Sequence, residues 1–128
     1  MPKTYSKSII VSVEDIDFND HVNNLVYLQW ALDISRDHWI SQVDEEIRDK
    51  YFWVVRKHQI EYLKPAFEKD EIELLTFVQG IRGPFSERLV HVLREGEVIV
   101  KVSSNWCFLE RASQKLRRVP EEIKELFL

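Results

Sequence analysis

The sequence predicts an α+β domain in which one long central helix is wrapped by an antiparallel sheet of about five strands. Two observations predict this fold class. Apolar residues recur at helical spacing over residues 24–40, and beyond residue 51 the pattern changes to the period of two that is typical of strands. Because the later strands follow one another through short turns, we expect antiparallel pairing, with the helix against one face of the sheet.

The composition is that of one folded domain. The chain has 128 residues, of which 45% are hydrophobic and 12% aromatic, so we expect residues 1–128 to form a single domain with one core. No apolar run approaches the ~18 residues that cross a bilayer, and residues 1–7 lack the apolar segment of a secretory signal. Cys107 is the only cysteine, which excludes an intramolecular disulfide and favours a cytoplasmic location.

Charge and residue usage argue against several kinds of partner. The formal net charge is −4, whereas nucleic-acid-binding proteins carry a broad basic surface, so we expect no nucleic acid and, without a spanning segment, no membrane partner. Three glycines leave little room for a phosphate-binding loop, so we expect no cofactor. His38, His58 and His91 lack the spacing of metal ligands, so we expect no metal.

The first half of the chain predicts a strand over residues 5–13 and a helix over 24–40. Leu25, Leu28 and Leu32 share one face of this helix. The adjoining faces carry further apolar residues: Tyr27, Trp30, Ala31 and Ile34. A helix that is apolar over most of its circumference is expected to be buried. The spacing of Ser41 and Asp44 resembles a capping box and predicts a short second helix that starts there.

The second half predicts four long strands, over residues 52–63, 71–81, 85–95 and 97–109. Pro65, Gly83-Pro84 and Glu95-Gly96 mark the turns between them. Pro120 with two following glutamates predicts a short surface helix over 120–127. One helix cannot cover both faces and both edges of such a sheet, so we expect a homodimer or homotetramer.

Residues 15–24 concentrate the chemistry of the chain. Carboxylate and amide side chains and His21 lie directly before the apolar helical pattern. A helix N-terminus offers backbone N–H donors to developing negative charge, and a carboxylate beside it can act as base or nucleophile. Histidine is the side chain best suited to proton exchange near neutral pH, so His21 is a candidate for that role.

The pattern Asp15-x-Asp17-x-x-x-His21-Val22-Asn23-Asn24, followed by Tyr27, resembles the signature of hotdog-fold thioesterases of the 4-hydroxybenzoyl-CoA thioesterase-like superfamily. Its finer form, Asp17-x-Asn19-x-His21-Val22-Asn23-Asn24, is similar to the catalytic segment of plant and bacterial acyl-ACP thioesterases. Two later segments, residues 60–71 and 106–120, also resemble this family. The resemblance covers almost the whole chain and implies the hotdog fold.

The resemblance implies an acyl thioesterase of fatty acid metabolism that hydrolyses acyl-CoA or acyl-ACP to free carboxylic acid and thiol. By the same resemblance, Asp17 is the catalytic base or nucleophile, and the backbone N–H of Asn24 polarises the thioester carbonyl. Asn19 and His21 orient water and substrate. The pantetheine arm enters at a subunit interface, and the acyl chain lies beside the buried helix.

The sequence departs from the family pattern at two places. Asp20 stands where many relatives carry glycine. Pro65 and Ala66 stand where the plant enzymes carry a further glutamate and cysteine, and Glu61 is a nearby carboxylate that could substitute as base, although Asp17 is the stronger candidate.

Other interpretations of these residues are weaker. Asp and Asn before a helix are ordinary caps, but their order here matches the family signature. A calcium loop fails because its sixth position is Asp20 rather than glycine and its twelfth is Val26 rather than glutamate. Cys107 is expected to be a partly buried strand residue rather than a nucleophile. The four tryptophans are expected in the core or at an interface. CoA phosphates could meet Lys115, Arg117 and Arg118, or else Arg82 or Arg88.

Two other functions remain open at this point. A hotdog dehydratase or hydratase also uses an acidic residue or histidine together with helix amides, and hydration of an enoyl thioester would distinguish it. A non-catalytic module that binds acyl thioesters would bind without releasing thiol.

Overall fold

The structure is a computed structural model that describes residues 2–128. Its strands are β1 (Thr4–Ile10), β2 (Tyr51–Tyr62), β3 (Glu71–Arg82), β4 (Phe85–Arg94), β5 (Glu97–Glu110) and β6 (Lys115–Leu116). Its helices are α1 (Asn24–Gln42), α2 (Glu45–Lys50) and α3 (Glu121–Phe127), with a 3₁₀ turn, η1, at Val13–Asp15. The predicted order of one strand, one long helix and four long strands is confirmed.

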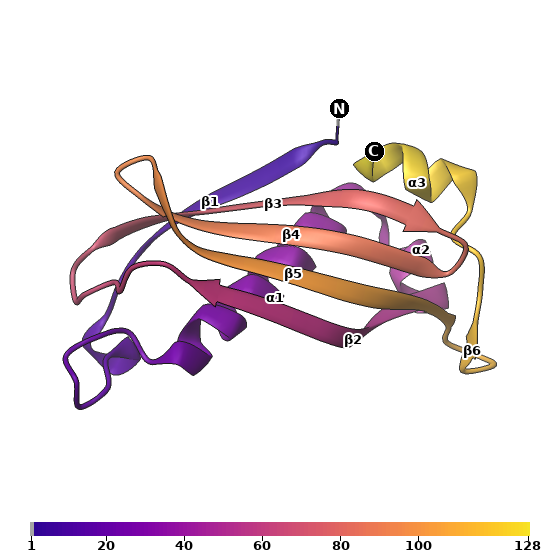
Figure 1. Cartoon of the computed structure of the whole chain (residues 1–128). Helices are drawn as coiled ribbons and strands as arrows, with labels where there is room; N and C mark the ends of the chain where they lie inside the picture. Colours follow the sequence, from indigo (N-terminus) through magenta and orange to yellow (C-terminus); the bar gives the residue numbers. More distant parts are fainter. Residues whose placement is uncertain (1) are drawn as a thin grey trace.

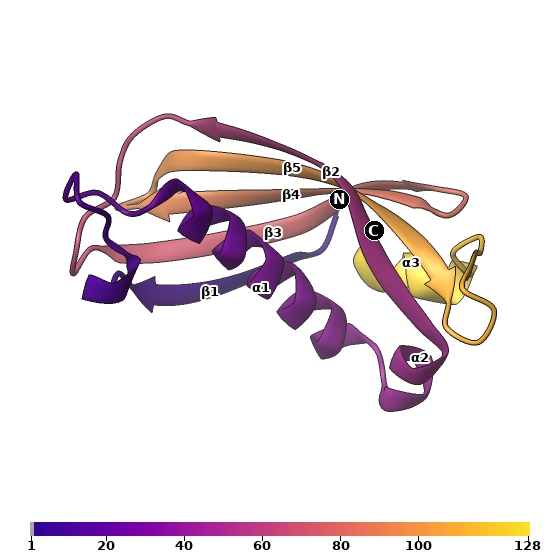
Figure 2. The ribbon, with the colours of Figure 1, turned by 90° about the horizontal axis from the view of Figure 1, so that it is seen from below.

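The long strands form one antiparallel sheet in the order β1-β3-β4-β5-β2, and the short β6 pairs with β5. The sheet curves, and α1 lies along one of its faces (Figures 1 and 2). The loop before α1 lies at one end of the helix, and α2 and α3 lie toward the other end (Figure 2). β2 is an edge strand, because β5 is its only partner in the described sheet.

Three local features differ from the sequence-based expectations. The first strand ends at Ile10 because Ser12 caps the η1 turn. The helix after α1 is capped by Asp44, whose side chain accepts the N–H of Ile47 at 3.0 Å. It does not start at Ser41, because Ser41 still belongs to α1 and donates its hydroxyl to the carbonyl of His38 at 2.7 Å. The sequence analysis did not predict β6.

The predicted short surface helix is confirmed as α3, but one of its faces is buried. Ile123 and Phe127 of α3 are buried. They pack in an apolar cluster with Val43, Val78, Phe108 and Val119. Two apolar residues spaced by four lie on one helix face, so even a seven-residue helix can bury a continuous stripe. α3 thus completes the core at the far end of α1.

The core consists of two apolar clusters with polar residues between them. The larger cluster lies near the start of α1 and includes Val22, Tyr27, Trp30, Ile34 and the strand residues that face them. The smaller cluster is the one that contains α3. The buried polar side chains come from α1, β3, β4 and β5: Ser35, His38, Thr76, Ser86, Arg88 and Ser104. We call these six residues the polar layer.

The faces of α1 differ in burial. The residues that face the sheet are buried: Tyr27, Trp30, Ala31, Ile34, Ser35 and His38. On the leucine face, by contrast, Leu25 is 73% exposed and Leu28 and Leu32 are only half-buried. The helix is therefore buried on one side only within a single chain, and it presents an apolar face that no described element covers.

Candidate active site

The loop that joins β1 to α1 is closed by backbone hydrogen bonds. The N–H of Asp17 donates to the carbonyl of His21 at 2.9 Å, and the N–H of Asn23 donates to the carbonyl of Asp15 at 2.9 Å. The N–H of Val22 donates to the carbonyl of Ala66 at 2.9 Å, which ties the loop to the segment between β2 and β3. We call residues 15–24 the motif loop. Its position at the start of α1 is fixed by these bonds.

The motif loop brings the predicted catalytic residues into one short turn. The carboxylate of Asp17 is half-buried, and its Oδ1 accepts the N–H of Asn19 at 2.8 Å. His21 is exposed, and its ring meets the edge of Phe67 at a centroid distance of 5.3 Å. Among residues 2–128, no hydrogen bond joins the side chains of Asn19 or His21 to the carboxylate of Asp17. The imidazole and the Asn19 amide are therefore free to meet a ligand.

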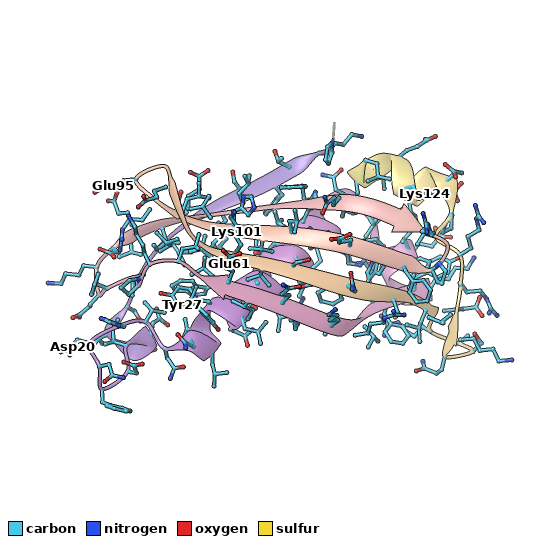
Figure 3. The ribbon with its side chains drawn as sticks, viewed as in Figure 1. Asp20, Tyr27, Glu61, Glu95, Lys101 and Lys124 are labelled. Atoms are coloured by element: carbon cyan, nitrogen blue, oxygen red, sulfur yellow. The ribbon has the colours of Figure 1, made fainter. Side chains whose placement is uncertain are left out.

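The backbone conformation at Asp20 explains why aspartate can stand where many relatives carry glycine. Its φ is +64°, in the left-handed region that favours glycine, and its N–H donates to the carbonyl of Asp17 at 3.1 Å. Aspartate is one of the few other residues that tolerate this conformation. The exposed side chain lies on the outer side of the loop (Figure 3). The change from glycine therefore leaves the turn intact.

The start of α1 presents backbone donors beside the motif loop. Asn23 caps the helix, and its Oδ1 accepts the N–H of Leu25 at 2.9 Å. Asn24 is the first helical residue, so its N–H has no acceptor within the helix. The carbonyl of Asn24 accepts the hydroxyl of Tyr62 at 3.3 Å, which links the helix start to the end of β2. An acyl carbonyl placed here would meet the positive end of the helix dipole.

The other carboxylate near this region is poorly placed. Tyr62 contacts α1 through Asn24 and Tyr27, so the preceding residue, Glu61, points to the opposite face of the sheet. There it stands opposite Lys101 of β5 (Figure 3). Ala66 occupies the position of a family catalytic residue, but its side chain is fully buried and its N–H donates to the hydroxyl of Tyr27 at 3.0 Å. Ala66 therefore has a structural role.

The surface around the motif loop is apolar. Phe18 in the loop is 94% exposed, and Leu25 follows in the first turn of α1. Tyr62, Leu63 and Phe67, which come from the end of β2 and the loop after it, also expose much of their side chains. Single exposed apolar residues are common, but a group of this kind marks a surface that meets another molecule.

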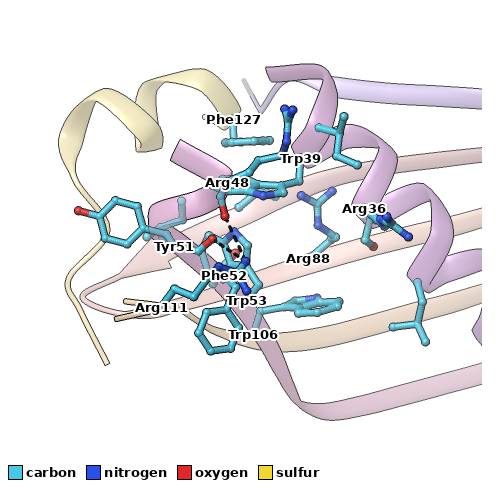
Figure 4. A pocket seen from close by; sticks show the side chains of 16 residues that line it. Arg36, Trp39, Arg48, Tyr51, Phe52, Trp53, Arg88, Trp106, Arg111 and Phe127 are labelled. Carbon is cyan, nitrogen blue, oxygen red and sulfur yellow. Dashed lines mark hydrogen bonds between the residues drawn. The ribbon is translucent and has the colours of Figure 1, made fainter. Parts of the chain in front are cut away.

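One cavity lies away from the motif loop. It has a volume of about 480 Å³ and lies between the C-terminal half of α1, the sheet and α3 (Figure 4). Its walls are largely aromatic: Trp39, Tyr51, Phe52, Trp53, Trp106 and Phe127. Four arginines also line it: Arg36, Arg48, Arg88 and Arg111. The sequence analysis did not predict this cavity.

Two ionisable groups of the polar layer have shifted pKa values. Burial and the adjacent Arg88 lower the pKa of His38 to about 4, so this imidazole is neutral at pH 7. Burial lowers the pKa of Arg88 to about 10, which leaves it charged at that pH. Arg88 is only 7% exposed, so a phosphate group would have to enter the cavity to meet it.

The remaining polar residues that the sequence analysis considered, Cys107 and Arg117 among them, have ordinary structural positions. Cys107 is a partly buried strand residue without a disulfide, as predicted. Arg117 pairs with Glu110 at 3.2 Å. Within residues 2–128, no group of three His, Cys, Asp or Glu side chains is placed to hold a metal ion. No helix in the same range is both long and apolar enough to cross a membrane.

The sequence as a whole decides the family. The family model that describes the N-terminal domain of acyl-ACP thioesterases matches residues 2–127. The chain belongs to the acyl-ACP thioesterase family. This finding confirms the resemblance that the motif loop suggested, and it extends that resemblance to nearly every residue of the chain.

One curated relative of this acyl-ACP thioesterase family member is a chloroplastic acyl-[acyl-carrier-protein] hydrolase, FATB3 of Cuphea viscosissima. It is 29% identical over 87 residues, which represent 66% of this chain and 21% of the relative. The matched region of this chain thus spans about a fifth of the length of that protein.

Solved structures establish the fold of this family member. The probable thioesterase YbaW from Escherichia coli superposes with a TM-score of 0.85 at 21% identity, covering 94% of both chains. An acyl-ACP thioesterase from Bacteroides thetaiotaomicron superposes with a TM-score of 0.82 at 18% identity, covering 91% of this chain and 49% of the other. The predicted hotdog fold, with its antiparallel sheet around a central helix, is confirmed.

Proposed function

We propose that this protein is an acyl thioesterase that hydrolyses an acyl-CoA or acyl-ACP thioester to a free carboxylic acid and a thiol. The observation that carries the proposal is the position of the Asp17 carboxylate. It lies in a loop that closes directly before α1, in a chain of the acyl-ACP thioesterase family. A carboxylate in the loop directly before a helix, together with a helix N–H that has no acceptor within the helix, supports thioester hydrolysis.

Asp17 activates the attacking water or attacks the thioester itself. In the first route, the carboxylate takes a proton from water, the water oxygen bonds to the carbonyl carbon, and the carbon–sulfur bond breaks. The departing thiolate then receives the proton. In the second route, the carboxylate displaces the thiolate and forms a mixed anhydride, which water hydrolyses. The free Oδ2 of Asp17 serves both routes, because Oδ1 is already held by Asn19.

The helix start supplies the oxyanion site. The carbonyl oxygen gains negative charge when the tetrahedral intermediate forms, and the N–H of Asn24 at the positive end of the α1 dipole stabilises that charge. Because the donor is main-chain, its position depends on the cap by Asn23 rather than on the side chain of Asn24. The side chains of Asn19 and His21 are exposed in the same loop as Asp17. Asn19 positions water, and the His21 imidazole passes the proton.

The active unit is a homo-oligomer, at least a dimer. β2 leaves one edge unpaired over twelve residues, and exposed strand edges of this length attract a second strand. Tyr62 of β2 contacts the start of α1, and both its side chain and the leucine face of α1 remain uncovered in one chain. A second copy paired along β2 would cover them and form a wall for the pantetheine arm beside the motif loop.

Turnover of a panel of acyl-CoA and acyl-ACP thioesters tests this function. We expect the Asp17→Asn variant to lose at least ~100-fold in kcat, the smallest contribution typical of a general base. Asp20→Asn is the matched control, because it makes the same chemical change in the same loop and asparagine tolerates a positive φ. Full activity of Asp17→Asn with every active substrate would refute the assigned role.

The same panel separates the other activities. An enoyl thioester that gains water without release of thiol identifies a hydratase. Tight binding of acyl thioesters with no thiol released from any of them identifies a binding module. Either result would replace the proposed hydrolysis.

A further inference from the structure

The polar layer is unusual because it crosses the middle of the core. The side chains of Thr76 and Ser104 are almost completely buried, and His38 is 1% exposed. Several of these groups have hydrogen-bond partners inside the domain. Ser35 donates its hydroxyl to the carbonyl of Ala31 at 2.7 Å, and the hydroxyl of Thr76 donates to the carbonyl of Leu89 at 2.8 Å. Buried polar groups of this kind are costly unless every one is satisfied.

Arg88 is the charged residue of the layer, and it has no counter-ion. Its Nη1 donates to Nδ1 of His38 at 2.9 Å and to Oγ1 of Thr76 at 3.0 Å. Both partners are neutral at pH 7, because burial and Arg88 itself lower the pKa of His38 to about 4. Within residues 2–128, no carboxylate lies within 4.0 Å of the guanidinium, so its positive charge is not balanced.

The free side of this guanidinium faces the cavity described above. Arg88 lines that cavity, and both of its hydrogen bonds leave from Nη1, so Nε and Nη2 can donate into the open space (Figure 4). Trp106 lines the same cavity, and its Nε1 is buried without a hydrogen-bond partner. A buried indole N–H normally has a partner. A partnerless N–H and an unbalanced cation on one cavity wall point to an acceptor that residues 2–128 do not provide.

The rest of the cavity wall also favours a negatively charged ligand. No aspartate or glutamate lines the cavity, whereas four arginines do. Arg48 and Arg111 are held by backbone carbonyls: Arg48 donates to Val43 at 2.7 Å, and Arg111 donates to Arg48 at 3.1 Å. None of the four arginines makes a salt bridge to a carboxylate of residues 2–128. Aromatic and aliphatic side chains make up most of the remaining wall, so the cavity combines an apolar surface with a concentrated positive charge.

We propose that this cavity binds the carboxylate end of an apolar chain, with Arg88 and the Nε1–H of Trp106 as the donors and the aromatic wall around the chain. An arginine fork matches the geometry of a carboxylate, and the indole N–H adds a third donor. The volume of about 480 Å³ is within the range of small-molecule sites. The carboxylate can come from two sources: a free fatty acid, or an acyl thioester whose far end carries a carboxylate.

Binding of free acids tests the first source without any catalysis. Trp39, Trp53 and Trp106 line the cavity, so intrinsic tryptophan fluorescence reports its occupancy. The full chain is titrated with dodecanoate and, as the uncharged comparison, with 1-dodecanol. We expect dodecanoate to bind at least about 10-fold more tightly, because a charge-assisted hydrogen bond to a buried arginine is lost with the alcohol.

Two variants assign the donors. Arg88→Met keeps a long apolar side chain and removes the charge, and it should weaken dodecanoate about 10- to 100-fold while leaving dodecanol unchanged. Arg82→Met is the matched control, since Arg82 ends β3 on the exposed surface and does not line the cavity. Trp106→Phe retains the ring and removes only the N–H. It keeps the proposal testable if Arg88→Met does not fold, and we expect a loss of about 3- to 10-fold.

Turnover tests whether the carboxylate belongs to the far end of an acyl thioester. Only this experiment rests on the proposed thioesterase function. Dodecanedioyl-CoA is compared with dodecanoyl-CoA. If the cavity binds the far carboxylate of a substrate, the diacid thioester has the lower KM, and Arg88→Met removes that difference. A preference in only one of the two arms identifies the source.

The inference is overturned if dodecanoate and dodecanol bind equally and the two thioesters have the same KM. It is also overturned if a carboxylate preference survives both Arg88→Met and Trp106→Phe. Failure of thioester hydrolysis would leave the titrations unaffected, so the cavity and the proposed function can fail independently.

Discussion

The buried histidine of the polar layer makes the stability of the domain depend on pH in a defined range. His38 stacks on Tyr5 at a centroid distance of 5.5 Å, meets Phe127 edge-on at 4.9 Å and accepts a hydrogen bond from Arg88. A protonated imidazole would lose that acceptor and would stand beside a second positive charge. This environment lowers its pKa from 6.5 to about 4 in the folded state.

The sign of the effect follows from which state binds the proton first. Between pH 6.5 and pH 4 the unfolded chain protonates its histidine while the folded chain does not, so stability decreases as the pH falls through this range. At about 1.4 kcal/mol for each pKa unit, the loss attributable to His38 is roughly 3 kcal/mol. Below pH 4 both states are protonated, and this contribution stays constant.

Urea unfolding of the wild type and of a His38 variant at several pH values measures the contribution of His38 to the free energy of unfolding. The His38→Asn variant places an amide oxygen near the position of Nδ1 and cannot titrate. Burial also lowers the pKa values of His58 and His91, and the carboxylates titrate in both proteins, so the difference between wild type and variant isolates His38. If that difference stays constant from pH 7 to pH 4, the imidazole is not held neutral by burial and Arg88, and the reasoning is refuted.

Three further perturbations have expected outcomes. Tyr27→Phe removes the acceptor of the buried N–H of Ala66 and should lower the free energy of unfolding by about 1–3 kcal/mol in urea unfolding. Asp44→Ala removes the cap of α2 and should cost about 1 kcal/mol by the same measurement. Val54→Lys adds a charge to the exposed edge of β2 and should shift the protein toward monomer in sedimentation velocity.

Each of these predictions has a matched control. Tyr5→Phe removes a half-buried hydroxyl that makes no side-chain hydrogen bond within residues 2–128, and a loss equal to that of Tyr27→Phe would contradict the role of the Ala66 bond. Ser41→Ala tests the alternative cap of α2, and a loss as large as that of Asp44→Ala would restore the sequence-based prediction. Val13→Lys changes an exposed valine far from β2, and dissociation by this variant as well would show that the β2 edge is not the interface.

The regular elements could be predicted because their signals are local. The alternation of Val98, Val100 and Val102 placed β5, and Pro65, Gly83 and Gly96 marked the turns that separate the strands. The loop residues Asp17, Asn19 and His21 were placed together because they are neighbours in the chain. Local spacing was sufficient in both cases.

The cavity and the polar layer could not be located in the same way, because they depend on which elements meet. Arg88 interacts with His38, which is fifty residues away in the sequence, and with Thr76 on the neighbouring strand. One signal was present. Ser86 and Arg88 occupy the inward phase of β4, in line with Val90 and Val92, so the alternation placed two polar residues where the core requires apolar ones.

Burial on α1 was only partly predictable for a related reason. The helix is apolar on more than one face, and its pattern alone could not tell which face meets the sheet. The spacing Tyr27, Ala31, Ile34, His38 is the one that packs inward, and it includes the histidine. The leucines that dominate the sequence pattern remain at the surface of one chain, where the proposed second copy would cover them.

The polar layer also determines how far α1 can slide along the sheet. Apolar side chains pack acceptably in several registers, whereas the bonds from Arg88 to His38 and Thr76 form in only one. A displacement by one helical turn, about 5.4 Å, would separate these groups and bury each of them alone. The same axial alignment sets where the first turn of α1 stands relative to the motif loop. The contacts of Arg88 in the middle of the domain therefore fix the position of the first turn of α1 relative to the motif loop, where Asp17 lies.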